Sequence, residues 1–395
     1  MPTATNELPS GLATLADHEQ LAQQRLDPRI WAYLCGAAGD ELTHTGNVDS
    51  WRGMELLPRV LRPLAGGHTR IQLLGRERPH PILVAPMAWH RLAHPDGELA
   101  TAVAAAALGA GLVVGTQSSC RLEDVAGSFL PGDDRGPLWF QLYLQPDRAF
   151  TRDLVRRAEV AGYEALVLTV DAPVQGARDR ERRAGFRLPA GVRSVNLDGM
   201  ELPASRTLGA AQSALFDDLL LHAPTWDDVT WLRSITRLPV LLKGVLHPED
   251  ARLAVEHGSS GLIVSNHGGR TLDTAISTAA ALPAVVDAVE GGVPVLVDGG
   301  IRRGTDVLKA MALGAAAVLV GRPVLHGLAN AGAHGVAHVL RLLRDELEIA
   351  MALTGCRTLA EAGTVVAPPV QRRNNPELHA RFQEILENAK HSRLE

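Results

Sequence analysis

The sequence has few cysteines, few aromatic residues, no long run of one charge and no long hydrophobic run. Its three cysteines, Cys35, Cys120 and Cys356, are far apart in the 395 residues and form no CxxC pair. An odd number of scattered cysteines argues against a disulfide framework and a cysteine-type zinc site, and it favours a reducing compartment. The first 25 residues lack the apolar segment of a signal peptide, and no apolar stretch reaches the ~18 residues of a membrane span. We therefore expect a cytoplasmic protein with no membrane partner.

The charge balance disfavours nucleic acid as a partner. The net charge is −5, and the chain has no long basic run of the kind that marks a nucleic-acid-binding surface. Hydrophobic residues make up 46% of the chain but aromatic residues only 4%, so the apolar mass is alanine, valine and leucine. That composition is typical of helices packed on a buried parallel sheet. The length suits one large domain with extensions, or two smaller domains.

Short apolar runs recur from residue 81 onward and predict eight strands. They lie at 81–88, 111–115, 138–144, 164–171, 238–244, 261–265, 293–298 and 316–321. These runs are continuous rather than alternating, as expected for strands buried on both faces. Most are followed by a helical pattern with capping residues, for example at 97–108, 149–161 and 305–313. Eight such units predict an α/β fold, a (β/α)₈ TIM barrel. A doubly wound sheet is the alternative, but the absence of a compositional break favours closure.

Three segments lie outside the repeat. Residues 1–80 are predicted to form an N-terminal helical cap of the same domain, and 81–362 the barrel. The stretch 172–237, between the fourth and fifth strands, is far longer than one helix with two short loops. Long insertions at the catalytic face of a barrel are usually functional. Residues 363–395 form a tail, in which 374–395 is charged and helix-prone and is predicted to be an outer helix or an oligomer contact.

The hexapeptide 265–270, SNHGGR, directly follows the apolar run of the sixth predicted strand. The C-terminal ends of barrel strands face one mouth, where these folds collect their chemistry. A base, His267, and a fixed cation, Arg270, suit an anionic substrate that must lose a proton. The two glycines between them let the backbone approach a ligand closely. Considered in isolation, the hexapeptide is equally consistent with a polar surface loop.

Other strand ends supply matching groups. Gly-rich turns with Arg302 and Arg322 follow the seventh and eighth strands, where this fold usually binds phosphate. The remaining strand-end residues are Pro86, Met87, Ala88, Gln141, Tyr143, Thr169, Asp171, Arg178, Lys243, Asp298, Gly299, Gly300 and Gly321. Any one could be structural, and a buried Lys243 could simply pair with a carboxylate. Their joint placement indicates an active site.

Nine short motifs carry a resemblance to a known family that runs from about residue 27 to residue 362. They are YLCGAAGDE at 33–41, PRVL at 58–61, APMA at 85–88, FQLY at 140–143, LTVD at 168–171, LKG at 242–244, SNHGGR at 265–270, DGGIRRG at 298–304 and GRP at 321–323. Together they resemble the FMN-dependent 2-hydroxy-acid oxidases and dehydrogenases, which include glycolate oxidase, lactate oxidase and mandelate dehydrogenases. The GAAGDE form is most similar to that of the lactate oxidases.

The resemblance implies FMN as the cofactor. The FMN phosphate would lie on Gly300, Arg302, Gly321 and Arg322, with Gly299 beside them and Asp298 at the ribityl chain. The isoalloxazine ring would contact Gln141, Thr169 and Ser265, and its N5 side the backbone of Pro86, Met87 and Ala88. Lys243 would lie near N1 and O2 and stabilise the anionic reduced flavin. Gly115 stands where relatives often carry an FMN-contacting serine, a contact for which Thr116 would compensate.

The resemblance also implies oxidation of an L-2-hydroxy acid to the 2-oxo acid. His267 would be the base, with Asp171 stabilising its imidazolium. Arg270 and Arg178 would hold the substrate carboxylate with Tyr33, and Tyr143 would contact the hydroxyl group. Two electrons would pass to flavin N5, as a hydride or through a carbanion, and then to oxygen; a quinone or a carrier protein is the alternative acceptor. A homo-oligomer, tetramer or octamer, is usual in such proteins.

Two pocket residues depart from the family pattern. Trp89 follows the first strand end and Gln117 the second, and both change the expected size and polarity of the pocket. Membership of the family therefore does not by itself predict a preference for an acid as small as lactate or glycolate.

Three other interpretations compete with this one. The pairs His90/His94 and His334/His338 have the spacing of metal ligands on a helix, but no acidic or cysteine partner supports them, so no metal is expected. Another kind of FMN-binding barrel, such as an isomerase, would share only the residues that bind the FMN phosphate. A flavin-binding protein without activity would lack catalytic groups. The combination of His267, Arg270, Tyr33 and Arg178 argues against the last two.

Overall fold

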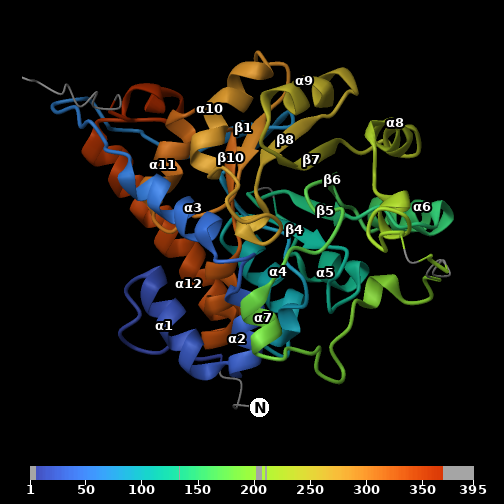
Figure 1. The fold of residues 1–395 in the computed structure, drawn as a ribbon. Helices are drawn as coiled ribbons and strands as arrows, with labels where there is room; N and C mark the ends of the chain where they lie inside the picture. The colour runs from blue at the N-terminus through green and yellow to red at the C-terminus, as the bar shows by residue number, and fades with distance from the viewer. Residues whose placement is uncertain (1–5, 133, 202–206, 210, 368–395) are drawn as a thin grey trace, which may run out of the picture.

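A closed barrel of eight parallel strands forms the centre of the protein, as a computed structural model shows for residues 6–132, 134–201, 207–209 and 211–367 (Figure 1). The strands follow the order β10-β3-β4-β5-β6-β7-β8-β9 around the barrel. Their bounds are β3 Ile82–Val84, β4 Gly111–Gly115, β5 Leu138–Leu142, β6 Ala165–Thr169, β7 Val240–Val245, β8 Gly261–Val264, β9 Val295–Val297 and β10 Ala317–Val320. All eight predicted strands and the TIM barrel are confirmed, and the doubly wound alternative is wrong.

The strands are apolar and buried on both faces, which explains their continuous apolar runs. Pairing of Val318 with Ile82 and of Val320 with Val84 closes the barrel. The register shifts once, between Lys243 and Val245 where β7 pairs with β8. Gly244 at this irregularity has φ 113°, and a Cβ there would collide with Asp171. Glycine therefore allows Asp171 to approach β7 closely.

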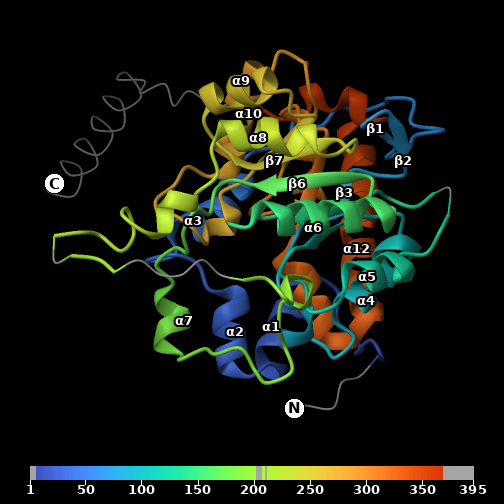
Figure 2. The same ribbon diagram turned by 90° about the vertical axis from the view of Figure 1, so that its right-hand side faces the viewer.

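Helices surround the barrel, and Figure 2 shows α6, α8, α9 and α10 outside the strands. They are α4 Gly97–Ala107, α5 Leu122–Ser128, α6 Arg148–Val160, α8 Trp226–Ser234, α9 Pro248–Glu256, α10 Thr278–Ala288, α11 Gly304–Ala312 and α12 Arg322–Thr354. Asp147 and Ser277 accept backbone hydrogen bonds as N-caps of α6 and α10. The predicted helical windows at 97–108, 149–161 and 305–313 are confirmed.

The N-terminal segment is only partly helical. Helices α1 Leu15–Arg25, α2 Pro28–Cys35 and α3 Leu42–Gly53 precede an antiparallel pair of strands, β1 Ile71–Leu73 and β2 Arg76–Arg78. Helix α1 packs along α12, and α3 packs against the 3₁₀ turn His267–Gly269. These three helices form the expected helical cap, and residues 71–78 add a hairpin in which a tight turn at Leu74 and Gly75 joins two strands. The division of the chain at residues 80 and 362 stays a prediction.

The predicted insertion lies between β6 and β7. It contains α7 Asp179–Arg183, which lies beside α2 (Figures 1 and 2), and two 3₁₀ turns, Val195–Leu197 and Leu219–His222. The predicted helix at 374–395 lies outside the described residues. Within the described ranges, no helix combines the length and the apolar character needed to cross a membrane. The three cysteines are free and buried.

Candidate active site

A cavity of about 1020 Å³ opens at the C-terminal ends of the barrel strands. It brings together eighteen of the predicted site residues, namely Tyr33, Pro86, Met87, Ala88, Gly115, Gln141, Tyr143, Thr169, Arg178, Lys243, His267, Arg270, Asp298, Gly299, Gly300, Arg302, Gly321 and Arg322. The other two, Asp171 and Ser265, hydrogen-bond to residues that line it. A second cavity, of about 1100 Å³, lies near the starts of β3 and β4, and none of the predicted site residues lines it.

His267 and Asp171 form a hydrogen-bonded pair at the cavity. Nδ1 of His267 lies 2.9 Å from Oδ1 of Asp171, and the main-chain N–H of His267 donates to Ser265 Oγ at 3.0 Å. Burial lowers the pKa of His267, and Asp171 opposes this shift without reversing it. Burial tends to raise the pKa of Asp171, but His267 lowers it below its usual value. A charged Asp171 therefore accepts from Nδ1–H of a neutral His267, which leaves Nε2 as the basic atom.

Lys243 is buried at the end of β7 and is held by two side chains. Its Nζ lies 3.1 Å from Asp298 Oδ2 and donates to Ser265 Oγ at 2.8 Å. Burial tends to lower the pKa of Lys243, but Asp298 and Asp171 raise it above its usual value. The lysine is therefore charged. Lys243 does pair with a carboxylate, the alternative that the sequence left open for a buried lysine, but it also lines the cavity.

Three arginines that line the cavity, Arg270, Arg302 and Arg322, have no carboxylate within ion-pair distance in the described part of the chain. Arg322 donates instead to the carbonyl oxygens of Gly268, at 3.0 Å, and Gly36, at 3.2 Å. Burial lowers the pKa of Arg322 to about 9, with further contributions from Arg270 and Arg302. Enclosed cations that repel one another require an anion for compensation, so this end of the cavity fits an anionic ligand.

The turn after β9 forms a glycine cradle beside these cations. Gly299 and Gly300 have φ of 89° and 84°, and a Cβ at Gly300 would collide with the backbone oxygen of Asn47. Oδ1 of Asp298, at the start of this turn, is buried and lacks a hydrogen-bond partner among the described residues. A buried unpaired acceptor calls for a donor such as a ligand hydroxyl group. The cations, the cradle and this acceptor together fit a phosphorylated polyol such as that of FMN.

Helix α3 holds two loops of the site, the one that follows β8 and the one that follows β9. The sequence did not predict this role. The side-chain amides of Asn47 and Asn266 are hydrogen-bonded to each other, and Nε1 of Trp51 donates to the Gly299 carbonyl at 2.8 Å. His44 Nδ1 lies 3.1 Å from NH1 of Arg322. Burial lowers the pKa of His44 to about 3, so the neutral ring accepts from the arginine. The one feature of the sequence that could have indicated these contacts is that the first family motifs, at 33–41 and 58–61, precede the first barrel strand.

Aromatic side chains form an apolar wall of the cavity. The rings of Tyr33 and Phe186 are stacked at 4.5 Å, and those of Tyr33 and Trp89 lie 5.4 Å apart. Nε1 of Trp89 donates to Ser194 Oγ at 3.0 Å, which connects the first strand end to the insertion. Predicted pocket residues Trp89 and Gln117 both line the cavity.

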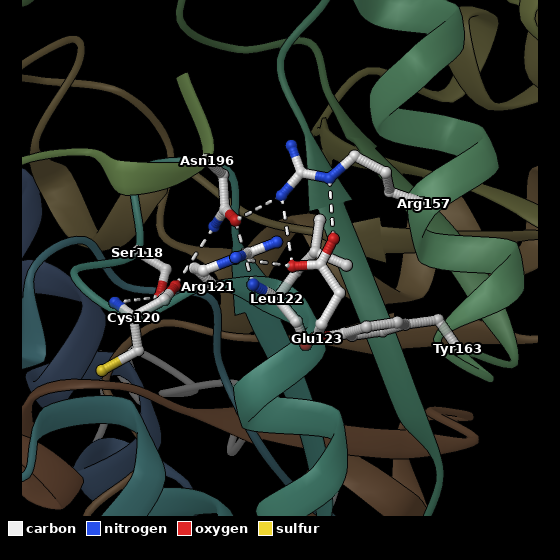
Figure 3. A network of polar contacts seen from close by, with 8 residues as sticks. All are labelled: Ser118, Cys120, Arg121, Leu122, Glu123, Arg157, Tyr163 and Asn196. Atoms are coloured by element: carbon white, nitrogen blue, oxygen red, sulfur yellow. Dashed lines mark hydrogen bonds and ion pairs between the residues drawn. The ribbon is translucent and has the colours of Figure 1, made fainter. Parts of the chain in front are cut away.

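A polar network anchors the insertion just beyond Ser194 (Figure 3). Oδ1 of Asn196 accepts from the N–H of Leu122 at 2.9 Å and from Arg157 at 3.3 Å, and its Nδ2 donates to the Cys120 carbonyl at 3.3 Å. Arg157 also pairs with Glu123 at 2.8 Å. Asn196 is fully buried, so this part of the insertion is fixed to α5 and α6, and the partner of Trp89 is fixed with it.

The histidine pairs make other contacts. Nδ1 of His90 is hydrogen-bonded to Thr101 Oγ1 at 3.0 Å, and Nδ1 of His338 to His18 at 2.9 Å. Nδ1 of His334 faces the carbonyl of Asn6 at 2.6 Å. Over the residues that the structure describes, no three histidine, cysteine, aspartate or glutamate side chains are grouped to hold a metal.

The fold and the site define a class of protein: a TIM barrel whose cavity, at the C-terminal mouth, fits a phosphate-bearing cofactor and an anionic ligand. The family described as FMN-dependent dehydrogenase matches residues 22–367. The chain belongs to this family, FMN is its cofactor, and it is an FMN-dependent oxidoreductase. The resemblance that the motifs predicted is confirmed.

Similar proteins include two bacterial L-lactate oxidases. That of Alicycliphilus denitrificans is 50% identical over 357 residues, 90% of this chain and 96% of the relative. That of a Roseobacter species is 51% identical over 362 residues, 91% and 96% of the two chains. A peroxisomal (S)-2-hydroxy-acid oxidase of Oryza sativa is 47% identical, with 87% of this chain and 93% of the relative covered.

Solved structures of mandelate oxidase are also similar. One with (S)-2-phenylpropionate has a TM-score of 0.80 and 45% sequence identity, and it covers 89% of this chain and 97% of its own. These relatives are FMN-dependent 2-hydroxy-acid oxidases.

Proposed function

We propose that this chain oxidises an L-2-hydroxy acid to the 2-oxo acid and that oxygen accepts the electrons. The observation that carries the proposal is that the His267–Asp171 pair faces the same cavity as Arg270 and Arg178. A neutral imidazole beside two guanidinium groups suits an acid that binds by its carboxylate and loses a proton. The names of the relatives, lactate oxidase and mandelate oxidase, support the same reaction class.

In this mechanism His267 Nε2 removes the substrate proton. Asp171 holds the ring through Nδ1–H and stabilises the imidazolium that forms. Arg270 and Arg178 hold the carboxylate, with Tyr33 at its side. Tyr143 faces the substrate hydroxyl group; burial raises the pKa of Tyr143 to about 12, so it stays a hydrogen-bond donor.

The cofactor would be held by the strand ends that line the cavity. Arg302, Arg322, Gly299, Gly300 and Gly321 would bind the phosphate, and Asp298 would accept from the ribityl chain. The flavin ring would be surrounded by Pro86, Met87, Ala88, Gly115, Gln141, Thr169, Lys243 and Ser265. Bound FMN supplies the acceptor for two electrons from the substrate. The buried charge of Lys243 favours negative charge developing next to it.

The aromatic wall indicates where the substrate side chain would lie. Trp89, Tyr33 and Phe186 offer apolar surface beside the two arginines. We infer that an apolar substituent on the 2-hydroxy acid contacts this wall, so aliphatic and aryl acids belong in any substrate panel.

Anaerobic reduction of the flavin tests the function. Bleaching by one or more acids from a panel of small, aliphatic and aryl 2-hydroxy acids is expected, followed by peroxide on admission of air. An absence of bleaching across the panel would contradict the proposal, and bleaching without peroxide would point to a quinone or carrier-protein acceptor.

A homo-oligomer in the cytoplasm is also part of the proposal. Leu42, Leu272 and Ile276 are more than half exposed. The carboxylate of Asp273 accepts from the N–H groups of Asp40 and Thr43, which brings the segment of Leu42 next to the segment of Leu272 and Ile276. Exposed apolar groups gathered in this way are typical of subunit contacts. Light scattering is expected to give the mass of a tetramer or an octamer.

A further inference from the structure

Arg178, one of the two arginines assigned to the substrate carboxylate, has an acidic partner within the protein. Its NH1 lies 3.5 Å from Oε2 of Glu181, three residues further along the chain in α7. The two side chains are only 15% and 17% exposed, and both residues line the cavity. Such an enclosed pair is screened less by water and salt than a surface pair.

The contact between Arg178 and Glu181 is loose. A strong charge-assisted hydrogen bond has a length of about 2.7–2.9 Å, and this one is longer. Nε of Arg178 is buried and lacks a hydrogen-bond partner among the residues described. The guanidinium therefore retains donors for a second anion, which a carboxylate would satisfy with both oxygens.

Arg270 stands in a different electrostatic environment. Its NH1 donates to the carbonyl oxygens of Tyr33 and Gly36, both at 2.8 Å, and its guanidinium lies 5.2 Å from the centre of the Tyr33 ring. Burial lowers the pKa of Arg270, Arg178 lowers it further, and Glu181 acts in the opposite direction. Glu181 therefore offsets the repulsion between the two arginines. It is one of three acidic residues lining the described cavity, with Asp218 and Asp298.

We propose that Glu181 is a specificity-determining residue that competes with the substrate carboxylate for Arg178. Without substrate, Glu181 supplies the negative charge that the two arginines need. When the substrate carboxylate binds, it takes over this role, and Glu181 becomes a like charge close to it that weakens binding. The inference rests on the proposed function, because it takes the substrate to be an acid bound by its carboxylate.

Binding of pyruvate to the oxidised holoenzyme, followed by the change in flavin absorbance, tests the proposal without turnover. Glu181→Gln, which keeps the size of the side chain, is expected to bind pyruvate about three- to tenfold more tightly. The KM of a reactive 2-hydroxy acid should fall by a similar factor, with the limiting rate of flavin reduction within about twofold of the original. Pyruvamide, a neutral analogue, should show no gain.

Asp179→Asn is the matched control. It removes one negative charge from the same helix, but Asp179 pairs with Arg182 and Arg183 and does not line the cavity. This variant should bind pyruvate like the original protein, and Glu181→Asp, which keeps the charge, should bind it less tightly than Glu181→Gln.

Unchanged or weaker pyruvate binding by Glu181→Gln, or an equal gain for pyruvamide, would overturn the proposal. The FMN content of each variant shows whether the site is intact. Failure of the proposed function is distinguishable, because the flavin would then stay oxidised with every 2-hydroxy acid while the pyruvate titration still reports the competition for Arg178.

Discussion

The side chains of Asn47 and Asn266, 219 residues apart in sequence, exchange two hydrogen bonds of 2.8 Å each. Asn266 directly precedes His267, and Oδ1 of Asn47 also accepts from the N–H of Thr278 at 3.1 Å. The backbone of Asn47 lies against Gly300 in the phosphate cradle. One asparagine on α3 therefore connects the loop of the proposed base to the loop of the proposed cofactor phosphate.

Asn47→Ala is expected to weaken both loops. It removes two of the hydrogen bonds of the buried Asn266 amide and leaves the buried Thr278 N–H without its acceptor. This should lower the free energy of unfolding by about 1–3 kcal/mol and FMN affinity by about tenfold or more. Urea unfolding and FMN titration measure the two effects. Asp49→Ala, an exposed change on the same helix, should alter stability by less than about 0.5 kcal/mol. Original FMN affinity in Asn47→Ala would contradict the role of this pair.

The pH dependence of kcat/KM should report the His267–Asp171 pair. The base must be neutral, and burial lowers its pKa from 6.5. Activity should therefore persist above pH 6.5 and fall as the pH drops through the lowered pKa. Asp171→Asn removes the group that raises the pKa of His267, so the acid limb should move to lower pH while the plateau falls by roughly 10²–10⁴.

A limb that moves to higher pH in Asp171→Asn would contradict this assignment. His267→Ala supplies the control, since its remaining activity should lack the acid limb altogether. Its FMN content should match that of the original protein, because none of the predicted phosphate contacts involves His267.

The barrel could be predicted because strands buried on both faces need continuous apolar runs, which are visible in sequence. The strand-end residues could be predicted for the same reason, since the ends of parallel strands meet at one face. The hairpin of β1 and β2 could not, because three-residue strands carry too little periodic signal. The partnerships Asn47–Asn266, Trp89–Ser194 and Arg178–Glu181 depend on tertiary packing or side-chain orientation.

Gly300→Ala is expected to abolish FMN binding. A Cβ there would collide with the backbone oxygen of Asn47, and the φ of 84° disfavours any residue with a side chain. The cradle must therefore shift. Gly127→Ala in α5 is the matched control, because nothing lies within 4 Å of a Cβ at that position. That change should be neutral or stabilising by up to about 1 kcal/mol. Bound flavin per chain after gel filtration compares the two.

Ser194→Ala should alter selectivity among substrates rather than cofactor binding. Ser194 holds the indole N–H of Trp89, and the network around Asn196 holds Ser194 in turn. Loss of one hydrogen bond, worth about 1 kcal/mol, leaves the indole less fixed in the aromatic wall. The ratio of kcat/KM for mandelate to that for lactate is therefore expected to change about three- to tenfold. Ser128→Ala, on the exposed side of α5, should leave the ratio unchanged. An unaltered ratio in Ser194→Ala, with full FMN content, would show that Trp89 is fixed by its ring contacts alone.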